Sequence, residues 1–350
     1  MLGLAFLLAA GLPFSIDVFS SGENGYHTFR IPAIVATNKG TLLAFAEGRI
    51  EGRGDAGNID LLLKRSPDKG RTWSPILTVA DFGPDTAGNP APVVDRRTGK
   101  IWLLFTSNLG TDKESAILKR TSAESRKVWV THSTDDGITW AKPIEITSTV
   151  KKPNWTWYAT GPGNGIQLKS GRLVVACDHN RFGEVRERYA HVIYSDDHGD
   201  TWKLGGSAGP DANESTVAEL PNGSLMLNMR SYAGRNRRLV SKSTDGGLTW
   251  TDPVDDAALV EPVCEGSLLR TGKVILFSNP ASNTRERLAI KVSRDGGKTW
   301  PVEKVIHQGP AAYSNLVELV DHSIGLLYEN GAKSPYEKIT FLSFGLNWLK

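Results

Sequence analysis

Cysteine and histidine, the residues that most often hold zinc in proteins, are few and scattered in this 350-residue chain. A structural zinc site needs a set of closely spaced ligands, and the two cysteines, Cys177 and Cys264, cannot build one. The seven histidines contain neither an HExxH motif nor a close pair. The sequence therefore predicts no metal, no cofactor and no disulfide framework.

Two short segments look like ligand-binding motifs but lack the context that these motifs need. Arg53-Gly54-Asp55 spells an integrin-type tripeptide, yet a match this short has a high false-positive rate. Residues 161–165 (GPGNG) are glycine-rich like a phosphate-binding loop, but Pro162 removes a backbone donor and no helix pattern follows. We expect this segment to be a loop at the mouth of one of the blade-like repeat units described next.

One repeated motif, S-x-D-x-G-x-T-W, organises the chain. Five copies keep every fixed position, at residues 66–73, 133–140, 195–202, 243–250 and 293–300. Their starts lie 67, 62, 48 and 50 residues apart, about the length of a four-stranded propeller blade with variable loops. In each copy the Asp can accept backbone N–H bonds and the Gly can take a positive φ, which predicts a hairpin turn followed by a Trp that packs into the blade.

Apolar, β-rich segments flank every copy of the motif. Strands are predicted directly before the motifs at residues 60–65, 127–132, 190–194, 238–242 and 288–292. Further strands are predicted after glycine turns at residues 41–47, 100–106, 172–177, 224–230 and 273–278. Because helical periodicity is scarcely visible, the prediction is an all-β fold with one domain over residues 15–350, whose closing blade combines N- and C-terminal strands.

Residues 1–14 form the only long apolar run, which is too short to span a bilayer at about 20 residues. Two interpretations remain open: the remnant of a signal peptide, or an N-terminal strand of the fold. If the run is a signal remnant, the mature protein is secreted or periplasmic.

Composition narrows the classes of function. Hydrophobic residues make up 39% of the chain and charged residues 23%, and the net charge is +3, all ordinary for a globular protein. The charges are dispersed, so no nucleic-acid-binding stripe is indicated, whereas a small anionic ligand is compatible with the excess of basic residues. Gly 36 and Trp 10 suit a protein made of short strands joined by tight turns.

Phe29-Arg30-Ile31-Pro32, followed by the five motifs, resembles the sialidase (neuraminidase) family, whose members carry an F/Y-R-I-P motif and repeated Asp boxes. The similarity runs from Arg30 to residues 347–349. It implies a six-bladed β-propeller and a retaining exo-α-sialidase that works through a tyrosyl-glycosyl intermediate. The implied partners are sialylated glycans, glycoproteins or gangliosides, with no nucleic acid and no membrane span, and a monomer is expected.

The resemblance assigns an arginine triad to the carboxylate of sialic acid. Arg30 and Arg230 are its first two members, and Arg285 is favoured over Arg287 as the third. Planar guanidinium groups suit this task because their paired donors match the two carboxylate oxygens. Arg49 resembles the arginine on the O4 side of the sugar.

The resemblance also assigns the reacting groups. Asp55 resembles the acid/base and Tyr313 the nucleophile, with Glu214 as its partner base, while Glu329 resembles the carboxylate that orients Arg30. A neutral phenol is suited to attack because the substrate carboxylate, on the same carbon, would repel an anionic nucleophile. With an ordinary pKa of about 10, that phenol needs a base within hydrogen-bond reach. The nearby Asp60 is expected to be structural.

Softer matches and competing functions complete the prediction. Residues 89–90, 157–158 and 178–179 resemble segments that line the N-acetyl and glycerol pockets of bacterial members. On the same fold, a trans-sialidase, an anhydro-forming sialidase or a sialidase that prefers the deaminated nonulosonic acid KDN are alternatives. A non-catalytic carbohydrate-binding propeller is a further alternative, although intact Asp55, Glu214 and Tyr313 count against it.

Overall fold

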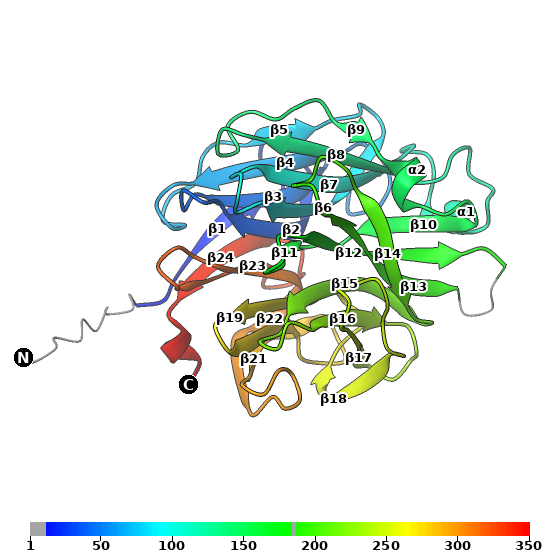
Figure 1. Cartoon of the computed structure of the whole chain (residues 1–350). Helices are drawn as coiled ribbons and strands as arrows, with labels where there is room; N and C mark the ends of the chain where they lie inside the picture. The colour runs from blue at the N-terminus through cyan, green and yellow to red at the C-terminus, as the bar shows by residue number, and fades with distance from the viewer. Residues whose placement is uncertain (1–11, 184–186) are drawn as a thin grey trace, which may run out of the picture.

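The computed structural model describes residues 12–183 and 187–350, and most of their regular structure is β-strand (Figure 1), which confirms the all-β prediction. The helical elements within these residues are short: α1 (Glu114–Leu118), α2 (Thr147–Val150) and the 3-10 helix η1 (Leu346–Leu349). No helix in the described part of the chain is long and apolar enough to cross a membrane.

The described strands pair into four largely antiparallel sheets. The first contains β2 (Thr28–Ala36), β3 (Leu42–Arg49), β4 (Ile59–Ser66), β6 (Thr86–Val94), β7 (Ile101–Asn108), β8 (Lys127–Ser133) and β9 (Ile144–Glu145), with β5 (Leu77–Ala80) beside β4. The second contains β10 (Trp155–Thr160), β12 (Leu173–Arg181), β13 (Arg188–Ser195) and β14 (Lys203–Ala208), with β11 (Ile166–Gln167) beside β12. The third contains β15 (Ala212–Glu219), β16 (Leu225–Ser231), β17 (Arg237–Ser243) and β18 (Val254–Val260).

The fourth sheet joins the two ends of the chain. It runs in the order β1 (Phe14–Ser20), β24 (Lys338–Phe344), β23 (Ile324–Asn330), β22 (Val302–Glu318), β21 (Glu286–Ser293), β20 (Val274–Pro280) and β19 (Ser267–Thr271). Figure 1 shows the blue β1 beside the red β24, as expected for a unit that combines N- and C-terminal strands. The first described strand begins at Phe14, and most of the apolar run, residues 1–11, lies outside the described residues.

The repeated motifs form the predicted turns. In the second copy, the Asp135 carboxylate accepts the backbone N–H of Thr139 at 2.9 Å, and the Ser133 hydroxyl accepts the N–H of Gly137 at 2.9 Å. Gly137 has a φ of 79°, in the left-handed region that glycine tolerates best. The motif tryptophans pack against the apolar clusters, so the turns also contribute to the core.

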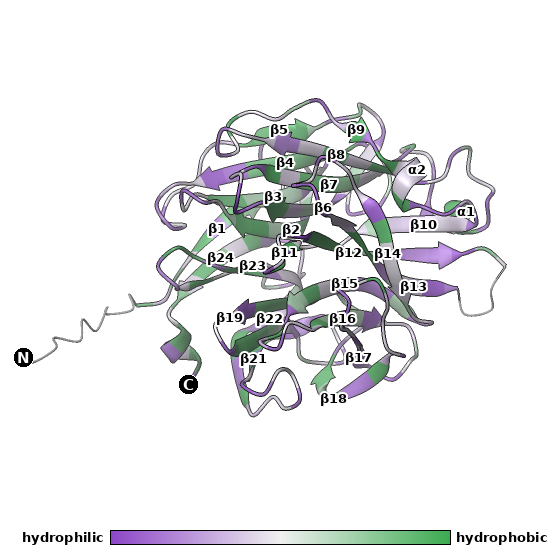
Figure 2. Ribbon diagram, in the orientation of Figure 1, coloured by the Kyte–Doolittle hydropathy of each residue, from purple (hydrophilic) through white to green (hydrophobic). Residues whose placement is uncertain are grey.

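Apolar side chains of neighbouring strand groups pack face to face to form the core. Figure 2 shows hydrophobic stretches within the strands, with hydrophilic residues frequent in the connecting loops. One cluster, for example, combines Leu104 and Val130 of the first sheet with Tyr158 and Val175 of the second. Sheets with one apolar face are stabilised by this kind of stacking.

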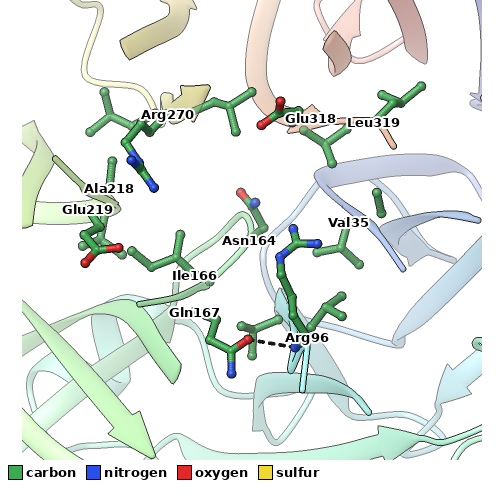
Figure 3. Close-up of a pocket in the computed structure, with 18 of the residues that line it drawn as sticks. Val35, Arg96, Asn164, Ile166, Gln167, Ala218, Glu219, Arg270, Glu318 and Leu319 are labelled. Atoms are coloured by element: carbon green, nitrogen blue, oxygen red, sulfur yellow. Dashed lines mark hydrogen bonds between the residues drawn. The ribbon is translucent and has the colours of Figure 1, made fainter. Parts of the chain in front are cut away.

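The innermost strands surround a cavity of about 390 Å³ that holds none of the predicted site residues. Figure 3 shows Val35, Ile166 and Ala218 converging on it from different sheets. The glycine-rich segment 161–165 reaches this region: Asn164 lines the cavity, and Gly161, Pro162 and Gly163 are buried. The segment is a loop, as predicted, but our expectation that it lies at the mouth of a blade is wrong, because it is buried in the interior between β10 and β11.

Candidate active site

Bulges at matching positions in five described strands carry the candidate site. In each bulge two residues of the inner strand oppose one residue of its neighbour, and the register shifts fall at residues 30–33, 88–91, 155–158, 212–215 and 311–314. Bulges commonly re-aim side chains next to active sites. Here the bulged residues that line one shared cavity of about 130 Å³ are Ile31, Asn89, Trp157, Asn213, Glu214 and Tyr313.

Prolines within two of these strands are a sequence signal for the bulges. Pro32 and Pro90 lie inside the register shifts of β2 and β6. Proline cannot donate to a strand ladder, so inside an inner strand it is expected at a bulge. The two X-Pro positions could therefore have located the bottom of the site.

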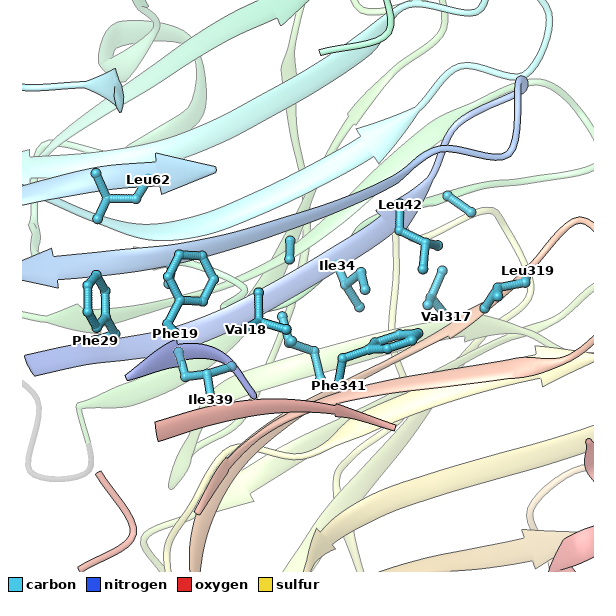
Figure 4. Close-up of a cluster of buried hydrophobic side chains, with 14 residues drawn as sticks. Val18, Phe19, Phe29, Ile34, Leu42, Leu62, Val317, Leu319, Ile339 and Phe341 are labelled. Carbon is cyan, nitrogen blue, oxygen red and sulfur yellow. The ribbon is translucent and has the colours of Figure 1, made fainter. Parts of the chain in front are cut away.

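The first bulge aims Arg30 into the cavity while its neighbours are held in the core. Figure 4 shows Phe29 and Ile34 of β2 within a buried apolar cluster that includes C-terminal residues such as Phe341. Ile31, which follows Arg30, has a φ of 58°. This conformation is strained for a β-branched residue and persists only where surrounding contacts enforce it.

Glu329 supplies those contacts. The side chain of this residue is fully buried, and its Oε1 accepts hydrogen bonds from Arg30 Nε at 3.0 Å and from the Ile31 N–H at 2.9 Å. Its Oε2 accepts the Tyr313 N–H at 3.1 Å. The predicted orienting residue thus contacts both Arg30 and the backbone of the predicted nucleophile.

Arg49 organises the loop that carries Asp55. Its Nη1 donates to the carbonyl oxygens of Arg53 at 2.6 Å and Gly54 at 3.0 Å, and lies 2.8 Å from Asp55 Oδ1. Its Nε and Nη2 donate to Glu47 Oε2. Arg49 therefore contacts all three residues of the integrin-type tripeptide, and the last of them, Asp55, lines the cavity.

The Asp55 carboxyl faces the cavity with its side chain 66% exposed. Burial by itself would raise its pKa, but the charges of Arg49 and Arg30 outweigh this and hold the pKa below its ordinary value. Asp60 lies apart from the cavity, where its Oδ2 accepts the Tyr26 hydroxyl at 2.7 Å. This placement agrees with a structural role for Asp60.

Tyr313 and Glu214 meet at the bottom of the cavity. The phenol donates toward both carboxylate oxygens, at 2.6 Å to Oε1 and 2.8 Å to Oε2. Arg230 Nη1 donates to Glu214 Oε2 at 2.7 Å and to the phenol oxygen at 3.1 Å. Burial first, and then the charge of Glu214, raise the pKa of Tyr313 well above its ordinary value, while Arg230 opposes this rise. Transfer of the phenolic proton therefore requires the adjacent carboxylate.

The third member of the predicted arginine triad, Arg285, lies in the cavity, whereas its alternative, Arg287, does not. Arg285 lines the cavity and donates to the Tyr336 hydroxyl at 2.7 Å and to the Val263 carbonyl at 3.2 Å. Arg287 instead forms an ion pair with Glu303 at 2.6 Å, outside the cavity. The structure thus brings Arg285, and not Arg287, together with Arg30 and Arg230.

The cavity contains a cationic side chain that is suited to bind an anion. Arg285 has no carboxylate within salt-bridge distance among the described residues, and the Nε of Arg230 is a buried donor that lacks a partner there. Because the charge of Arg285 is not paired with a carboxylate of the described residues, a carboxylate ligand beside it would form charge-assisted hydrogen bonds.

The sequence did not identify Arg126, a further arginine that lines the cavity. Its side chain is buried, and its Nη1 donates to Asn89 Oδ1 at 2.9 Å and to the Tyr158 carbonyl at 3.2 Å. Its guanidinium stacks 4.0 Å from the ring centre of Trp157. Asn89 and Trp157 belong to the softer matches, but Arg126 itself stands in no motif.

Asp178, which belongs to the last of the softer matches to the family, lies behind the cavity. Asp178 is fully buried, and its Oδ1 accepts from the Asn213 side chain at 2.8 Å. Burial raises the pKa of Asp178 well above its ordinary value, and the charge of Glu214 adds to this rise. Asp178 therefore supports the bulge that carries Glu214 and does not contact the cavity.

Comparisons with known proteins agree on one family. A family model described as BNR repeat-like domain matches residues 40–327. A sialidase from Micromonospora viridifaciens is 34% identical over 95% of this chain, and an exo-alpha-sialidase from Aspergillus fumigatus is 32% identical over 96% of this chain and 88% of its own length. The solved structure of the Hadza microbial sialidase Hz136 has a TM-score of 0.87 and 34% identity, covering 96% of this chain and 69% of that one.

The chain spans only part of some relatives. It covers 54% of the length of the Micromonospora sialidase and 62% of the length of a sialidase from Bacteroides fragilis that is 35% identical over 90% of this chain.

Proposed function

Because the chain belongs to the sialidase family, we propose that it is a retaining exo-α-sialidase that releases terminal sialic acid from glycans. The observation that carries this proposal is the contact of the Tyr313 phenol with Glu214, at 2.6 Å, in a cavity also lined by Arg30, Arg230 and Arg285. A nucleophile, its base and an anion-binding set are the parts that hydrolysis of a sialoside needs.

Substrate binding would begin with the carboxylate. Its oxygens would accept from Arg285 and would lie beside Arg230 and Arg30, the latter held in place by Glu329. Charge-assisted bonds of this kind contribute about 1.5–3 kcal/mol each. They would place the anomeric carbon, which bears the carboxylate, above the Tyr313 oxygen.

In the first chemical step, the Tyr313 oxygen attacks the anomeric carbon and its proton passes to Glu214, while Asp55 protonates the departing glycosidic oxygen. In the second step, Asp55 takes a proton from water, and that water displaces the Tyr313 oxygen, which recovers its proton from Glu214. In the free site Arg49 and Arg30 keep the pKa of Asp55 low. A substrate carboxylate beside Arg30 would offset part of that positive charge, and Asp55 would then hold its proton more readily.

A specific observation favours KDN as a second candidate donor. If the segments around Asn89 and Trp157 hold the C5 substituent, as the family resemblance implies, that substituent meets the buried guanidinium of Arg126. A 5-hydroxyl can accept a hydrogen bond from this group, whereas a 5-acetamido group can accept through its carbonyl oxygen but also brings an apolar methyl against the buried charge. Comparison of kcat/KM for N-acetyl and KDN fluorogenic donors tests the choice.

For the architecture, we infer a six-bladed propeller over residues 15–350. Support comes from the innermost strands β2, β6, β11, β15, β19 and β22, which share one cavity. A hydrogen bond of 2.8 Å from the Ile34 N–H to Asn315 Oδ1 links the first of these strands to the last. Radial repetition of blades around such a cavity leaves only short, protected sheet edges.

The activity is tested with a fluorogenic N-acetyl sialoside, and with its KDN counterpart, between about pH 4 and about pH 8. We expect release of the fluorophore, with the α-anomer of the free sugar as the first product by NMR. A 2,7-anhydro product would indicate an anhydro-forming sialidase, and transfer to lactose a trans-sialidase. Absence of release from both donors throughout this pH range would reject the proposal in favour of a carbohydrate-binding propeller.

A further inference from the structure

The bulge that presents Tyr313 is held by two carboxyl groups. The register of β22 against β23 shifts between Ala311 and Ser314. Inside this shift the Tyr313 N–H donates to Glu329 Oε2 at 3.1 Å, and the next N–H, of Ser314, donates to Glu265 Oε2 at 2.9 Å. Glu329 belongs to the family pattern, whereas no motif in the sequence singles out Glu265.

The setting of Glu265 differs from that of Glu329. Its side chain is 3% exposed and its Oε1 is a buried atom without a hydrogen-bond partner among the described residues. It forms no ion pair there, while Glu329 is paired with Arg30. Burial raises the pKa of Glu265 well above its ordinary value, although the hydrogen bond from the Ser314 N–H opposes this rise. An unpaired buried carboxyl is costly for folding, which calls for an explanation at this position.

The segment that carries Glu265 is firmly anchored. Arg238, whose side chain is fully buried, donates to the Cys264 carbonyl at 2.6 Å and to Glu261 Oε2 at 3.2 Å. The Cys264 N–H donates to the same oxygen of Glu261 at 3.1 Å. The carboxyl of Glu265 is therefore presented to β22 from a rigid support.

We propose that Glu265 is a positioning residue for the reaction: by accepting the Ser314 N–H it fixes the bulge that holds the Tyr313 phenol against Glu214. The inference rests on the proposed sialidase function. Its physical basis is the dependence of the rate on the position of the attacking oxygen, since a shift of about 1 Å in a reacting group can lower a rate about 10²-fold. Glu265 contacts neither the cavity nor the substrate and acts only through the backbone of β22.

Two variants separate the acceptor role from simple filling of space. Glu265→Gln keeps an acceptor for the Ser314 N–H, and we expect kcat and KM within about threefold of the parent values. Glu265→Leu keeps the volume but removes the acceptor, and we expect kcat to fall about 10²-fold with KM within about threefold, because the arginines still hold the carboxylate. Ser278→Ala is the matched control, since it removes a buried side-chain bond of 2.8 Å to the Ser314 hydroxyl and leaves the Ser314 N–H untouched.

The rate at which 2,3-difluorosialic acid labels Tyr313, followed by mass spectrometry, is a second readout that a purely structural role would not change. We expect labelling to slow in Glu265→Leu and to remain near the parent rate in Glu265→Gln and Ser278→Ala. Thermal unfolding of each variant shows whether it is folded. If Glu265→Leu is folded and labels and turns over like the parent protein, or if Glu265→Gln is as impaired as Glu265→Leu, the inference is wrong. If the parent protein itself shows neither turnover nor labelling, the proposed function fails, and the two failures are thereby distinguished.

Discussion

Arg30 and Glu329 lie 299 positions apart in the chain, yet their side chains form a buried pair with Nε 3.0 Å from Oε1. This contact ties the first inner strand, β2, to β23, the strand before the last one in the chain. Because Glu329 also accepts the Tyr313 N–H at 3.1 Å, one carboxylate holds a predicted carboxylate-binding group and the predicted nucleophile in a fixed relation. Stability and activity are therefore coupled at this residue.

Glu329→Ala should destabilise the fold strongly. Removing one partner of a buried pair leaves an uncompensated charge on Arg30, and the expected loss is about 3–5 kcal/mol in the free energy of unfolding, measured by urea denaturation. The control is Asp321→Asn, which breaks an exposed pair with Lys69 and should cost at most about 1 kcal/mol. Equal losses in the two variants would contradict a special role for Glu329.

Tyr313→Phe should abolish turnover without unfolding the protein. It removes the oxygen that lies 2.6 Å from Glu214, and we expect kcat to fall at least about 10³-fold on a fluorogenic sialoside. Tyr328→Phe is a matched control, because Tyr328 is similarly buried but lies outside the cavity. Undiminished turnover in Tyr313→Phe would reject the nucleophile assignment.

The scaffold could be predicted from the sequence because its signals are local. In each repeated motif the Asp bonds residues only a few positions away, as Asp245 does with the Thr249 N–H at 2.9 Å. Strand alternation and glycine turns are equally short-range. These contacts involve so few residues that their spacing alone specifies the turn.

The site could be assigned only in part, because its contacts are long-range. Residue types and order were enough to nominate Arg30 and Tyr313, but only through the family resemblance. Arg126 could not be found, since its surroundings at Asn89 and Tyr158 are set by tertiary packing. Glu265 was missed for the same reason, because its partner Ser314 lies 49 positions away.

Arg285→Ala and Arg287→Ala should differ sharply, although the two residues are almost adjacent. Loss of the cavity arginine removes a charge-assisted bond to the substrate carboxylate, and kcat/KM should fall about 10- to 100-fold. Loss of Arg287 breaks only a partly exposed pair with Glu303 and should leave kcat/KM within about twofold. Affinity for the unsaturated sialic acid analogue should follow the same order. The reverse pattern would move the third triad position to Arg287.

Asp135 should stabilise the fold at neutral pH and lose this effect in acid. Its bonds from Thr139 lower the pKa to about 2, against burial, which raises it. A pKa lowered in the folded state gives stability that is present above the unfolded pKa of about 3.9 and is lost as pH falls through the folded value. After solvent screening we expect Asp135→Asn to cost about 1 kcal/mol at pH 7. Urea unfolding at several pH values should show this difference shrinking toward pH 2, and a constant difference would contradict the account.

Two substrates with different leaving groups test whether Asp55 is the general acid. Asp55→Ala removes the proton donor, so turnover of a natural sialoside, whose departing alcohol needs protonation, should fall about 10²- to 10⁴-fold. An aryl sialoside with an acidic phenol departs without that proton, and its glycosylation step should be affected far less. Asp60→Asn is the control, because it retains an acceptor for the Tyr26 hydroxyl and lies outside the cavity, and both substrates should be turned over as by the parent protein.

Since Asp55 is also predicted to activate water, burst kinetics separate the two steps of the reaction. In Asp55→Ala the covalent intermediate should accumulate on the aryl substrate. Equal losses on both substrates without a burst would assign Asp55 to substrate binding, through Arg49 and Arg30, in place of proton transfer.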